Sequence, residues 1–273
     1  MLDKYSVLMS VYSGEKAEYL RTSIESMLGQ TVKPDQFVIV KDGQLGEELE
    51  RVINHYSSQD ERLFTVVELP ENEGLGVALD EGISHCRNEL VARMDSDDIS
   101  LPDRCEKELA LFEKNPELSI VSGNIGEFDE DPDTIFSIRT VPEKHEDIVK
   151  RMRIRSAFNH PAVMFKKSDV IRCGGYGLLR RKQDHVLFSK MINNGCQSYN
   201  IQDVILLFRE NSDGISRKKS WENCSGYIKA QTQNFKRGEC NIFELLFIYV
   251  SQIVVFIFPH WLTNLVKRKF YRT

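Results

Sequence analysis

The sequence predicts an α/β fold built on a mostly parallel sheet. Over the first hundred residues, apolar runs typical of buried strands alternate with segments whose apolar residues recur every three or four positions, as in amphipathic helices. Such alternation indicates βαβ units, whose helices cover both faces of the sheet. With 273 residues, 41% of them apolar, the chain is long enough to bury the core that this fold requires.

Four strands and three helices are expected in this first part. The runs YSVLMS, QFVIV, LFTVVEL and ELVARM predict strands at 5–10, 36–40, 63–69 and 89–94. The helices between them are predicted from apolar faces, which comprise Tyr19, Leu20, Ile24, Met27 and Leu28, then Leu49, Val52, Ile53 and Tyr56, then Leu75, Leu79 and Ile83.

Beyond residue 98 the alternation is less regular, which predicts a mixed α+β half grafted on the same sheet over 99–217. Helices are expected at 101–115, with Pro102 in the first turn, at 145–152 and at 184–194. Strands are expected at 118–125, at the end of 156–165 and at 204–208. The acidic stretch 127–133 is interpreted as a solvated turn.

Charge and cysteine content exclude some classes of function. The chain has 36 basic and 41 acidic residues, so it lacks the positive field that non-specific nucleic-acid binding needs, and we expect no nucleic-acid partner. Its six cysteines form no CxxC pair, which predicts reduced thiols. The start MLDKYSVLMSVY has no secretory pattern. We therefore expect a cytoplasmic protein.

A C-terminal helical tail is predicted over 218–273. Its apolar run at 245–258 is 14 residues long, whereas a spanning helix needs about 20. Trp261 and the basic end VKRKFYRT follow, a combination that suits an anionic membrane surface. We expect the tail to attach the protein to the inner face of the cell membrane. A helix that packs on its own domain or on a second subunit, as in a homodimer, is the alternative.

Polar residues follow each of the four strands predicted in the first part. Ligands of open parallel sheets bind beyond the carboxyl ends of the strands, so we expect these residues to converge at one edge. They are Ser10 and Tyr12, then Asp42, then Asn72 and Gly74, then Asp95 and Asp97.

Asp95, Ser96 and Asp97 form a DxD tripeptide in the stretch VARMDSDDISLPDR. Two carboxylates about 6 Å apart repel by roughly 3 kcal/mol at an effective dielectric constant near 20, so crowded acids favour a bound cation. Carboxylate and phosphate oxygens suit Mn²⁺ or Mg²⁺. We therefore expect Asp95 and Asp97 to hold such a metal together with a diphosphate. A turn or a helix N-cap is the alternative interpretation.

Several stretches resemble, in order, the successive blocks of family 2 glycosyltransferases, which are inverting nucleotide-sugar enzymes of GT-A fold. They are YSVLMSVYSGEKAEYLRTSIESMLGQT, FVIVKDG, NEGLGVALDEGI and VARMDSDDISLPDR, followed by FNHPAVMF, CGGYG and QDHVLFSKMINNG. The likeness covers about residues 5–217, and members that build bacterial capsule, exopolysaccharide or lipopolysaccharide are particularly similar. It implies a nucleotide-sugar-binding half over 1–98 and an acceptor-binding half of the same GT-A domain over 99–217.

The resemblance assigns donor contacts to the predicted sheet edge. It implies that Ser10 and Tyr12 contact the nucleobase and that Asp42 accepts from the uracil imide. The loop with Asn72 and Gly74 would border the ribose. Strand-end packing of Tyr12 and an Asp-Gly turn at Asp42 are the alternatives. Lys41 replaces a first acid that the family more often has beside Asp42.

On the acceptor side, the resemblance makes Asp184 the candidate general base, with a helix N-cap as the alternative role. Gln183 replaces the acid that commonly precedes it. His160, Gly175 and Tyr176 look like acceptor-side elements, although a single histidine is often structural. A further basic set could close over the diphosphate as a lid or could be a solvated run; it comprises Arg209, Arg217, Lys218 and Lys219.

The expected function is therefore metal-dependent, inverting transfer of a hexose or N-acetylhexosamine from a UDP-sugar to a saccharide acceptor, which the tail and the resemblance suggest is lipid-linked. Two rivals stay open. A catalytically silent UDP-sugar-binding subunit is motivated by Lys41 and Gln183. A sugar nucleotidyltransferase would need a glycine-rich basic loop after the first strand, where SVYSGEKAEYL offers one glycine.

Overall fold

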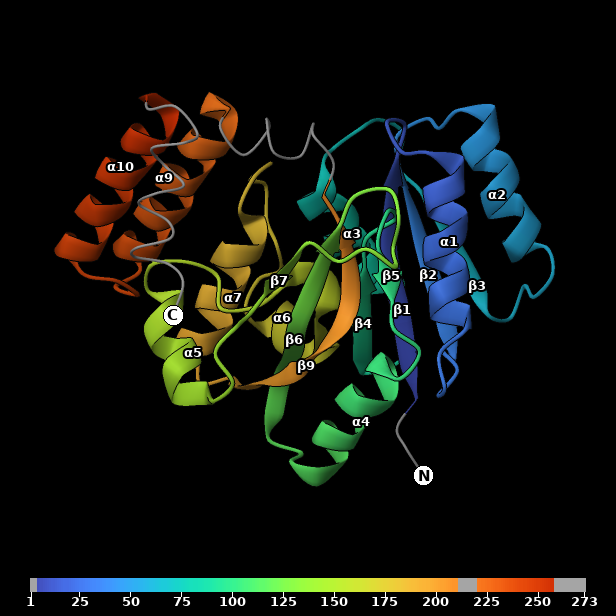
Figure 1. The fold of residues 1–273 in the computed structure, drawn as a ribbon, viewed down its shortest axis with the longest axis horizontal. Coiled ribbons are helices and arrows are strands. Elements are labelled where there is room, and N and C mark those ends of the chain that lie inside the picture. The colour runs from blue at the N-terminus through green and yellow to red at the C-terminus, as the bar shows by residue number, and fades with distance from the viewer. Residues whose placement is uncertain (1–3, 211–219, 258–273) are drawn as a thin grey trace.

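A sheet of nine strands organises the residues that the computed structural model describes, 4–210 and 220–257 (Figure 1). Its main path runs β3-β2-β1-β4-β8-β6-β9-β5, and β7 pairs with β6. The strands are β1 (Tyr5–Tyr12), β2 (Gln36–Asp42), β3 (Phe64–Glu68), β4 (Leu90–Met94), β5 (Ile99–Ser100), β6 (Leu118–Phe128), β7 (Ser137–Arg139), β8 (Met164–Lys166) and β9 (Gln197–Arg209).

Among the described residues, four of the eight strand pairs are parallel, and these four have the longest registers. The pairs β1–β2, β1–β4, β2–β3 and β6–β9 are parallel, whereas β8 is antiparallel to both β4 and β6. The short strands β5 and β7 are antiparallel to β9 and β6. The predicted α/β fold with a mostly parallel sheet is confirmed, and the sheet continues from the first half of the chain into the second.

Helices cover both faces of this sheet. They are α1 (Ala17–Leu28), α2 (Glu47–Ser57), α3 (Leu75–His85), α4 (Arg104–Lys114), α5 (His145–Met152), α6 (Lys167–Arg172) and α7 (Gln183–Asn193), with a 3-10 turn η1 (His160–Ala162). Apolar residues of α1, α2 and α4 share one core with Val7 and Met9, while those of α3, α5, α6 and α7 share a second core with Leu8. Alternate residues of β1 therefore point into opposite layers, as the two-residue period of a strand requires.

The structure corrects three boundaries that the sequence analysis predicted. Helix α4 begins at Arg104, so Pro102 lies before the helix and not in its first turn. Leu101 donates to the carbonyl of Ile205 and so prolongs the pairing of β5 with β9, and Pro102 and Asp103 then form a turn before the helix. The predicted strand 204–208 is the end of the longer β9. Phe128 belongs to β6 and is fully buried, so the solvated turn begins after it.

The C-terminal part forms two helices, α9 (Trp221–Lys236) and α10 (Ile242–Ile257), which lie side by side at the end of the molecule away from α1 and α2 (Figure 1). Helix α9 contacts α7, and α10 contacts α9. Within the described ranges, no helix is both long and apolar enough to span a bilayer. One face of α10 is nevertheless apolar and exposed: Ile242, Phe243, Leu246, Phe247, Val250, Ile253 and Ile257.

All six cysteines lie within the described residues, and each is free and buried. Burial raises the pKa of Cys86 to about 12, and it raises the pKa of Cys105 to the same value. These thiols are therefore part of the packed interior.

Candidate functional site

Strand register places the predicted residues along one edge of the sheet. Tyr12, the last residue of β1, pairs with Asp42, the last residue of β2. On the other side of β1, Met9 pairs with Met94, so the residues after Met94 continue beside Ser10. The side chain of Ser96 donates to Glu15, 2.6 Å away, and so ties the turn after β4 to the loop after β1. The carboxyl ends of β1, β2 and β4 thus form one site.

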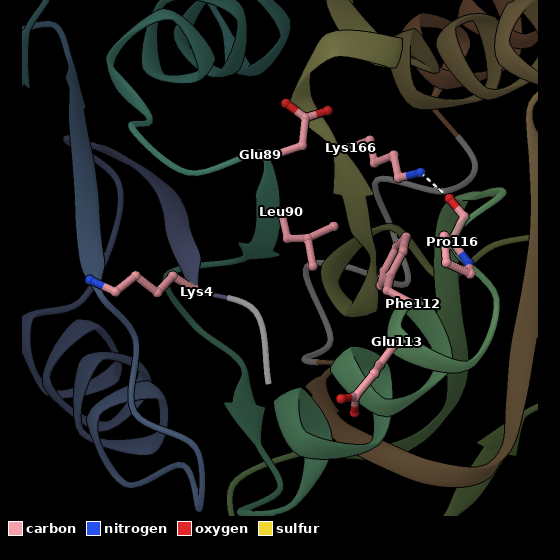
Figure 2. Close-up of a pocket in the computed structure, with 7 residues that line it drawn as sticks. All are labelled: Lys4, Glu89, Leu90, Phe112, Glu113, Pro116 and Lys166. Carbon is pink, nitrogen blue, oxygen red and sulfur yellow. Dashed lines mark hydrogen bonds between the residues drawn. The ribbon is translucent and has the colours of Figure 1, made fainter. Parts of the chain in front are cut away.

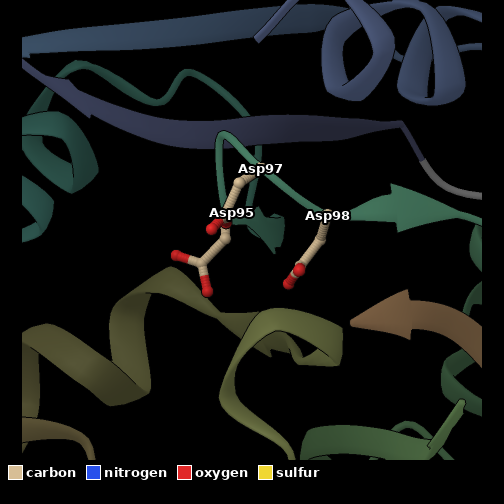
Figure 3. Close-up of side chains that lie close together, drawn as sticks. All are labelled: Asp95, Asp97 and Asp98. Carbon is tan, nitrogen blue, oxygen red and sulfur yellow. The ribbon is translucent and has the colours of Figure 1, made fainter. Parts of the chain in front are cut away.

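Three carboxylates project from the turn between β4 and β5 (Figure 3). Oxygens of Asp95, Asp97 and Asp98 lie within 4.8 Å of one another. Burial, followed by the charges of Asp95 and Glu15, raises the pKa of Asp97 to about 7. Burial and the two neighbouring carboxylates also raise the pKa of Asp98 well above its usual range. The cluster therefore concentrates negative charge that is poorly solvated.

Two arginines border this cluster. Arg93, buried in β4, donates from both terminal nitrogens to Asp95, with Nη1 and Oδ2 2.7 Å apart. The backbone nitrogen of Arg209 donates to Oδ1 of Asp98, and its guanidinium lies 3.9 Å from the centre of the Tyr19 ring. Arg209 is 9% exposed, so it is not a solvated cation. Arg217, Lys218 and Lys219 lie outside the described residues.

The acidic cluster suits a divalent cation. Oδ2 of Asp98 is buried and has no hydrogen-bond partner within the described part of the chain. The Asp97 carboxylate forms no ion pair with any described residue, and hard cations take such oxygens. A bound cation would share Asp95 with Arg93, because Arg93 contacts both oxygens of that carboxylate. The sequence analysis missed Arg93, although a charge inside the apolar run ELVARM is an unusual feature.

The Asp42 carboxylate is fully engaged by the loop after β3. It is 4% exposed and accepts from Nδ2 of Asn72 at 3.1 Å and from the backbone nitrogens of Glu73 at 2.8 Å and Gly74 at 3.1 Å. Gly43 has a φ of +83°, as an Asp-Gly turn requires. Asp42 therefore shapes the loop over which the resemblance places a ribose.

Tyr12 is an exposed donor-contact candidate, with 43% of its surface accessible. A Cβ added at Gly14 would lie 2.5 Å from the Tyr12 ring, so the glycine lets the ring lie over the following loop. Neighbouring Lys41 points elsewhere, since its ammonium pairs with Glu50 and Glu68 of the adjacent helix and strand. The substitution at Lys41 is thus accommodated as an ion pair within the fold.

A glycine-rich turn carries the predicted acceptor-side residues. Both carboxylate oxygens of Asp80, in α3, accept from this turn: the nitrogen of Tyr176 is 2.8 Å away and that of Gly177 is 2.9 Å away. The Tyr176 hydroxyl lies 2.9 Å from Nε2 of His160. Burial and the charge of Arg93 lower the pKa of His160 well below its usual value, so the ring is neutral. Asp80 was not predicted, and nothing in its helical surroundings marks it.

Asp184 lies in the first turn of α7 and is half-buried. The N-cap position is Lys182, and no side chain caps the helix, so the alternative of Asp184 as an N-cap is wrong. Its carboxylate forms no hydrogen bond or ion pair with any residue that the structure describes. Burial, followed by the charges of Asp184, Asp80 and Asp95, raises the pKa of Tyr176, so both acidic centres are near enough to act on its hydroxyl.

A cavity of about 440 Å³ lies at the opposite edge of the sheet (Figure 2). Leu90 and Phe112 line it together with two lysines that already have partners: Lys4 pairs with Asp35, and Lys166 donates to the Pro116 carbonyl. A wider groove of about 810 Å³ between α1 and α2 reaches Glu15 and so adjoins the acidic edge. We therefore place the functional site at the carboxyl ends of the strands.

Two solved structures share this architecture. Mannosyltransferase PcManGT of Pyrobaculum calidifontis, solved with GDP-Man and Mn²⁺, matches with a TM-score of 0.66 and 15% identity over 98% of this chain and 80% of that one. A fragment of S. aureus TarS, solved with UDP-GlcNAc, matches with a TM-score of 0.67 and 15% identity over 93% and 73%. The expected GT-A fold is confirmed.

Sequence relatives extend the likeness over almost the entire chain. A protein of Haemophilus influenzae described as an uncharacterized glycosyltransferase is 35% identical over 270 residues, which cover 99% of this chain and 98% of that protein. The UDP-Gal:alpha-D-GlcNAc-diphosphoundecaprenol beta-1,3-galactosyltransferase of Escherichia coli is 33% identical over 98% and 97%. The sequence profile of Glycosyl transferase family 2 matches residues 6–188. The chain therefore belongs to glycosyltransferase family 2.

Proposed function

We propose that this glycosyltransferase moves a hexose or N-acetylhexosamine from a UDP-sugar to a lipid-linked saccharide, with inversion, during synthesis of a bacterial surface polysaccharide. The observation that carries this proposal is the cluster of three carboxylates at the carboxyl ends of the strands, with Asp184 near enough that its charge acts on Tyr176 as that of Asp95 does. The cluster of Asp95, Asp97 and Asp98 suits a cation and its diphosphate. Asp184 lies in the first turn of α7, and its carboxylate forms no hydrogen bond or ion pair with any described residue.

The donor would lie along the carboxyl ends of β1, β2 and β4. Tyr12 offers an exposed ring for stacking on the base. Ser10 lies beside it, and the loop with Asn72 and Gly74, held by Asp42, borders the ribose. The Asp42 carboxylate accepts from three groups of this loop and is 4% exposed, so a uracil imide could use its remaining acceptor site only if the loop opened around it.

The proposed chemistry is one displacement at the anomeric carbon. Asp184 takes the proton of the acceptor hydroxyl, whose oxygen bonds to the anomeric carbon as the bond from that carbon to the diphosphate oxygen breaks. Asp95 and Asp97 would hold Mn²⁺ or Mg²⁺, which supplies Lewis-acid stabilisation of the leaving diphosphate. A single displacement inverts the configuration, so a UDP-α-sugar gives a β-linked product.

The acceptor and its location follow from separate observations. The Escherichia coli relative acts, by its name, on a diphosphoundecaprenol-linked sugar. In this chain the exposed apolar face of α10 precedes the basic sequence VKRKFYRT. We infer that this face docks on the inner surface of the cell membrane, where such an acceptor is held. A homodimer that buries the same face is the competing arrangement.

A panel of UDP-sugars assayed with Mn²⁺ for UDP release tests this function. We expect turnover with one of them, and Asp184→Asn should lower it by roughly 10²–10⁴-fold because the proton acceptor is lost. Asp97→Ala should abolish the response to Mn²⁺. UDP binding without turnover would identify a silent subunit, and formation of UDP-sugar from UTP and a sugar phosphate would identify a nucleotidyltransferase. Wild-type turnover in both variants would refute the site.

A further inference from the structure

The turn that leads into α7 has an unusual backbone conformation. Lys182 has a φ of 64° and a ψ of 22°, and it is the one non-glycine residue with a positive φ within 4–210 and 220–257. A lysine gains nothing from the left-handed region that would offset its steric cost, so the surrounding structure must hold it there. Asp184, the proposed base, follows two residues later.

Helix α9 holds this turn from outside. The Lys182 ammonium lies 4.1 Å from the centre of the Tyr227 ring, a cation–π contact. The neighbouring Arg181 donates from Nε to Glu222 at 3.2 Å. Between these two contacts, Gly226 packs directly against the turn, since a Cβ added there would lie 2.7 Å from Cβ of Arg181. Three residues of α9, one charged, one small and one aromatic, therefore contact residues 181 and 182.

Buried polar contacts continue this interface along α7. Nε2 of His185 lies 3.2 Å from Nδ2 of Asn234, and the hydroxyl of Ser189 donates to Oε2 of Glu239 at 2.8 Å. All four residues are at most 8% exposed. Directional contacts of this kind fix the rotation of α7 against the C-terminal segment, because a turn of α7 would break buried hydrogen bonds.

We propose that α9 is a positioning element for catalysis, and that Tyr227 and Gly226 hold the turn at Arg181 and Lys182 so that Asp184 faces the acceptor. The inference rests on the proposed role of Asp184. The family profile ends at residue 188, so it includes the turn at Arg181 and Lys182 but not α9, which contacts that turn. Tyr227 acts through the turn and has no direct role in the chemistry.

The test compares Tyr227→Leu, which removes the ring, with Tyr227→Phe, which keeps it. We expect Tyr227→Leu to lower kcat about tenfold, because a small misplacement of a reacting group is costly. The KM for the UDP-sugar selected by the panel and the Kd for UDP should stay within about twofold, since the donor edge is separate. Tyr227→Phe should match the wild type. The assay uses an α-GlcNAc diphosphate with an undecyl chain as the acceptor. Without that compound, it measures hydrolysis of the UDP-sugar, in which water is the acceptor.

Three further variants make the result specific. Lys182→Met should reproduce the loss of kcat, and the double variant with Tyr227→Leu should be no worse than the more impaired single variant, because both remove one contact. Gly226→Ala should also lower kcat by displacing Arg181, whereas Lys229→Ala, at an exposed position of the same helix, should not. Hydrogen exchange at residues 183–188 should be faster in the impaired variants.

The proposal is overturned if Tyr227→Leu retains wild-type kcat and exchange, or if Tyr227→Phe is impaired equally. Equal losses of kcat and UDP affinity would also overturn it, since they indicate general destabilisation. These outcomes differ from failure of the proposed function, in which the wild type shows no sugar transfer or Asp184→Asn remains fully active.

Discussion

Most charged side chains at the carboxyl edge of the sheet bind the protein itself. Asp42 holds the loop after β3, Arg93 holds Asp95, and Lys41 bridges two glutamates. By contrast, Asp97 forms no ion pair with a described residue, Oδ2 of Asp98 has no hydrogen-bond partner among them, and the Asp184 carboxylate has neither kind of partner there. These side chains are therefore available to bind a ligand or to accept a proton.

Arg93 gives a test of the acidic cluster that does not depend on turnover. Arg93→Met removes the cation that pairs with Asp95 and leaves poorly solvated carboxylates together, so we expect the free energy of unfolding to fall by about 3 kcal/mol without metal. Millimolar Mn²⁺ should restore part of this loss. Urea unfolding with Mn²⁺ and with chelator measures both values. An equal loss under both conditions would contradict cation binding at this cluster.

His160 predicts a pH dependence of stability. Its pKa is lowered in the folded protein, so below about pH 6.5 the unfolded chain binds a proton that the native ring does not. Stability should therefore decrease as pH falls below 6.5, by at most about 1.4 kcal/mol per pH unit from this group. His160→Gln keeps a hydrogen-bonding group near Tyr176 and should flatten the slope between pH 6.5 and 5. An unchanged slope in urea unfolding would exclude His160 as its source.

Among the secondary-structure elements, the turn 173–177 depends most on backbone geometry. Gly175 has a φ of +63°, and a Cβ there would overlap Oδ1 of Asp80, the oxygen that accepts from Tyr176. Gly177 also has a positive φ, at +74°, but a Cβ there would meet open space. The two glycines thus share the conformational constraint and differ in steric surroundings.

Alanine substitutions at these glycines separate the two effects. Gly177→Ala should cost about 1 kcal/mol through its conformation alone. Gly175→Ala should cost a further 1–3 kcal/mol or so, because Asp80 must move. Thermal and urea unfolding of both variants measure the difference. Equal costs would show that Asp80 does not constrain the turn.

The regular βαβ part of the fold could be predicted from the sequence, because each strand and helix there carries its own apolar pattern. Pro102 was misplaced because its extended neighbour pairs with Ile205, a contact with no local signal. The acidic cluster was predictable from the strand-end rule. Arg93 and Asp80 were not, since the partners of each are fixed by turns that tertiary packing determines.

The C-terminal helices give the protein two chemically different ends. The acidic site lies at the strand edge, while the exposed apolar residues gather on α10. The sequence after α10 contains four basic residues and no acidic one, whereas the chain has five more acidic than basic residues in total. Excluding these four, the rest of the chain carries 32 basic and 41 acidic residues, so an anionic bilayer would attract this end and repel the remainder.

Vesicle binding tests this polarity. We expect the full chain to sediment with vesicles that contain phosphatidylglycerol more than with neutral ones, and less in high salt. Leu246→Gln with Val250→Gln should weaken binding about tenfold or more, because both side chains are at least half exposed on α10. Gln231 of α9 is buried, so it is not substituted in this experiment. Light scattering that shows a dimer disrupted by the same pair would favour subunit contact over lipid.

Because the six thiols are buried, a spectroscopic label can be directed to a cysteine introduced at the surface. Because all six native cysteines are buried, maleimide reagents should have little access to them in the folded state. If Lys229, which is exposed, is replaced by cysteine, a fluorophore should label that position selectively, and no native cysteine has to be replaced. Movement of α9 during turnover could be followed in the otherwise unaltered enzyme.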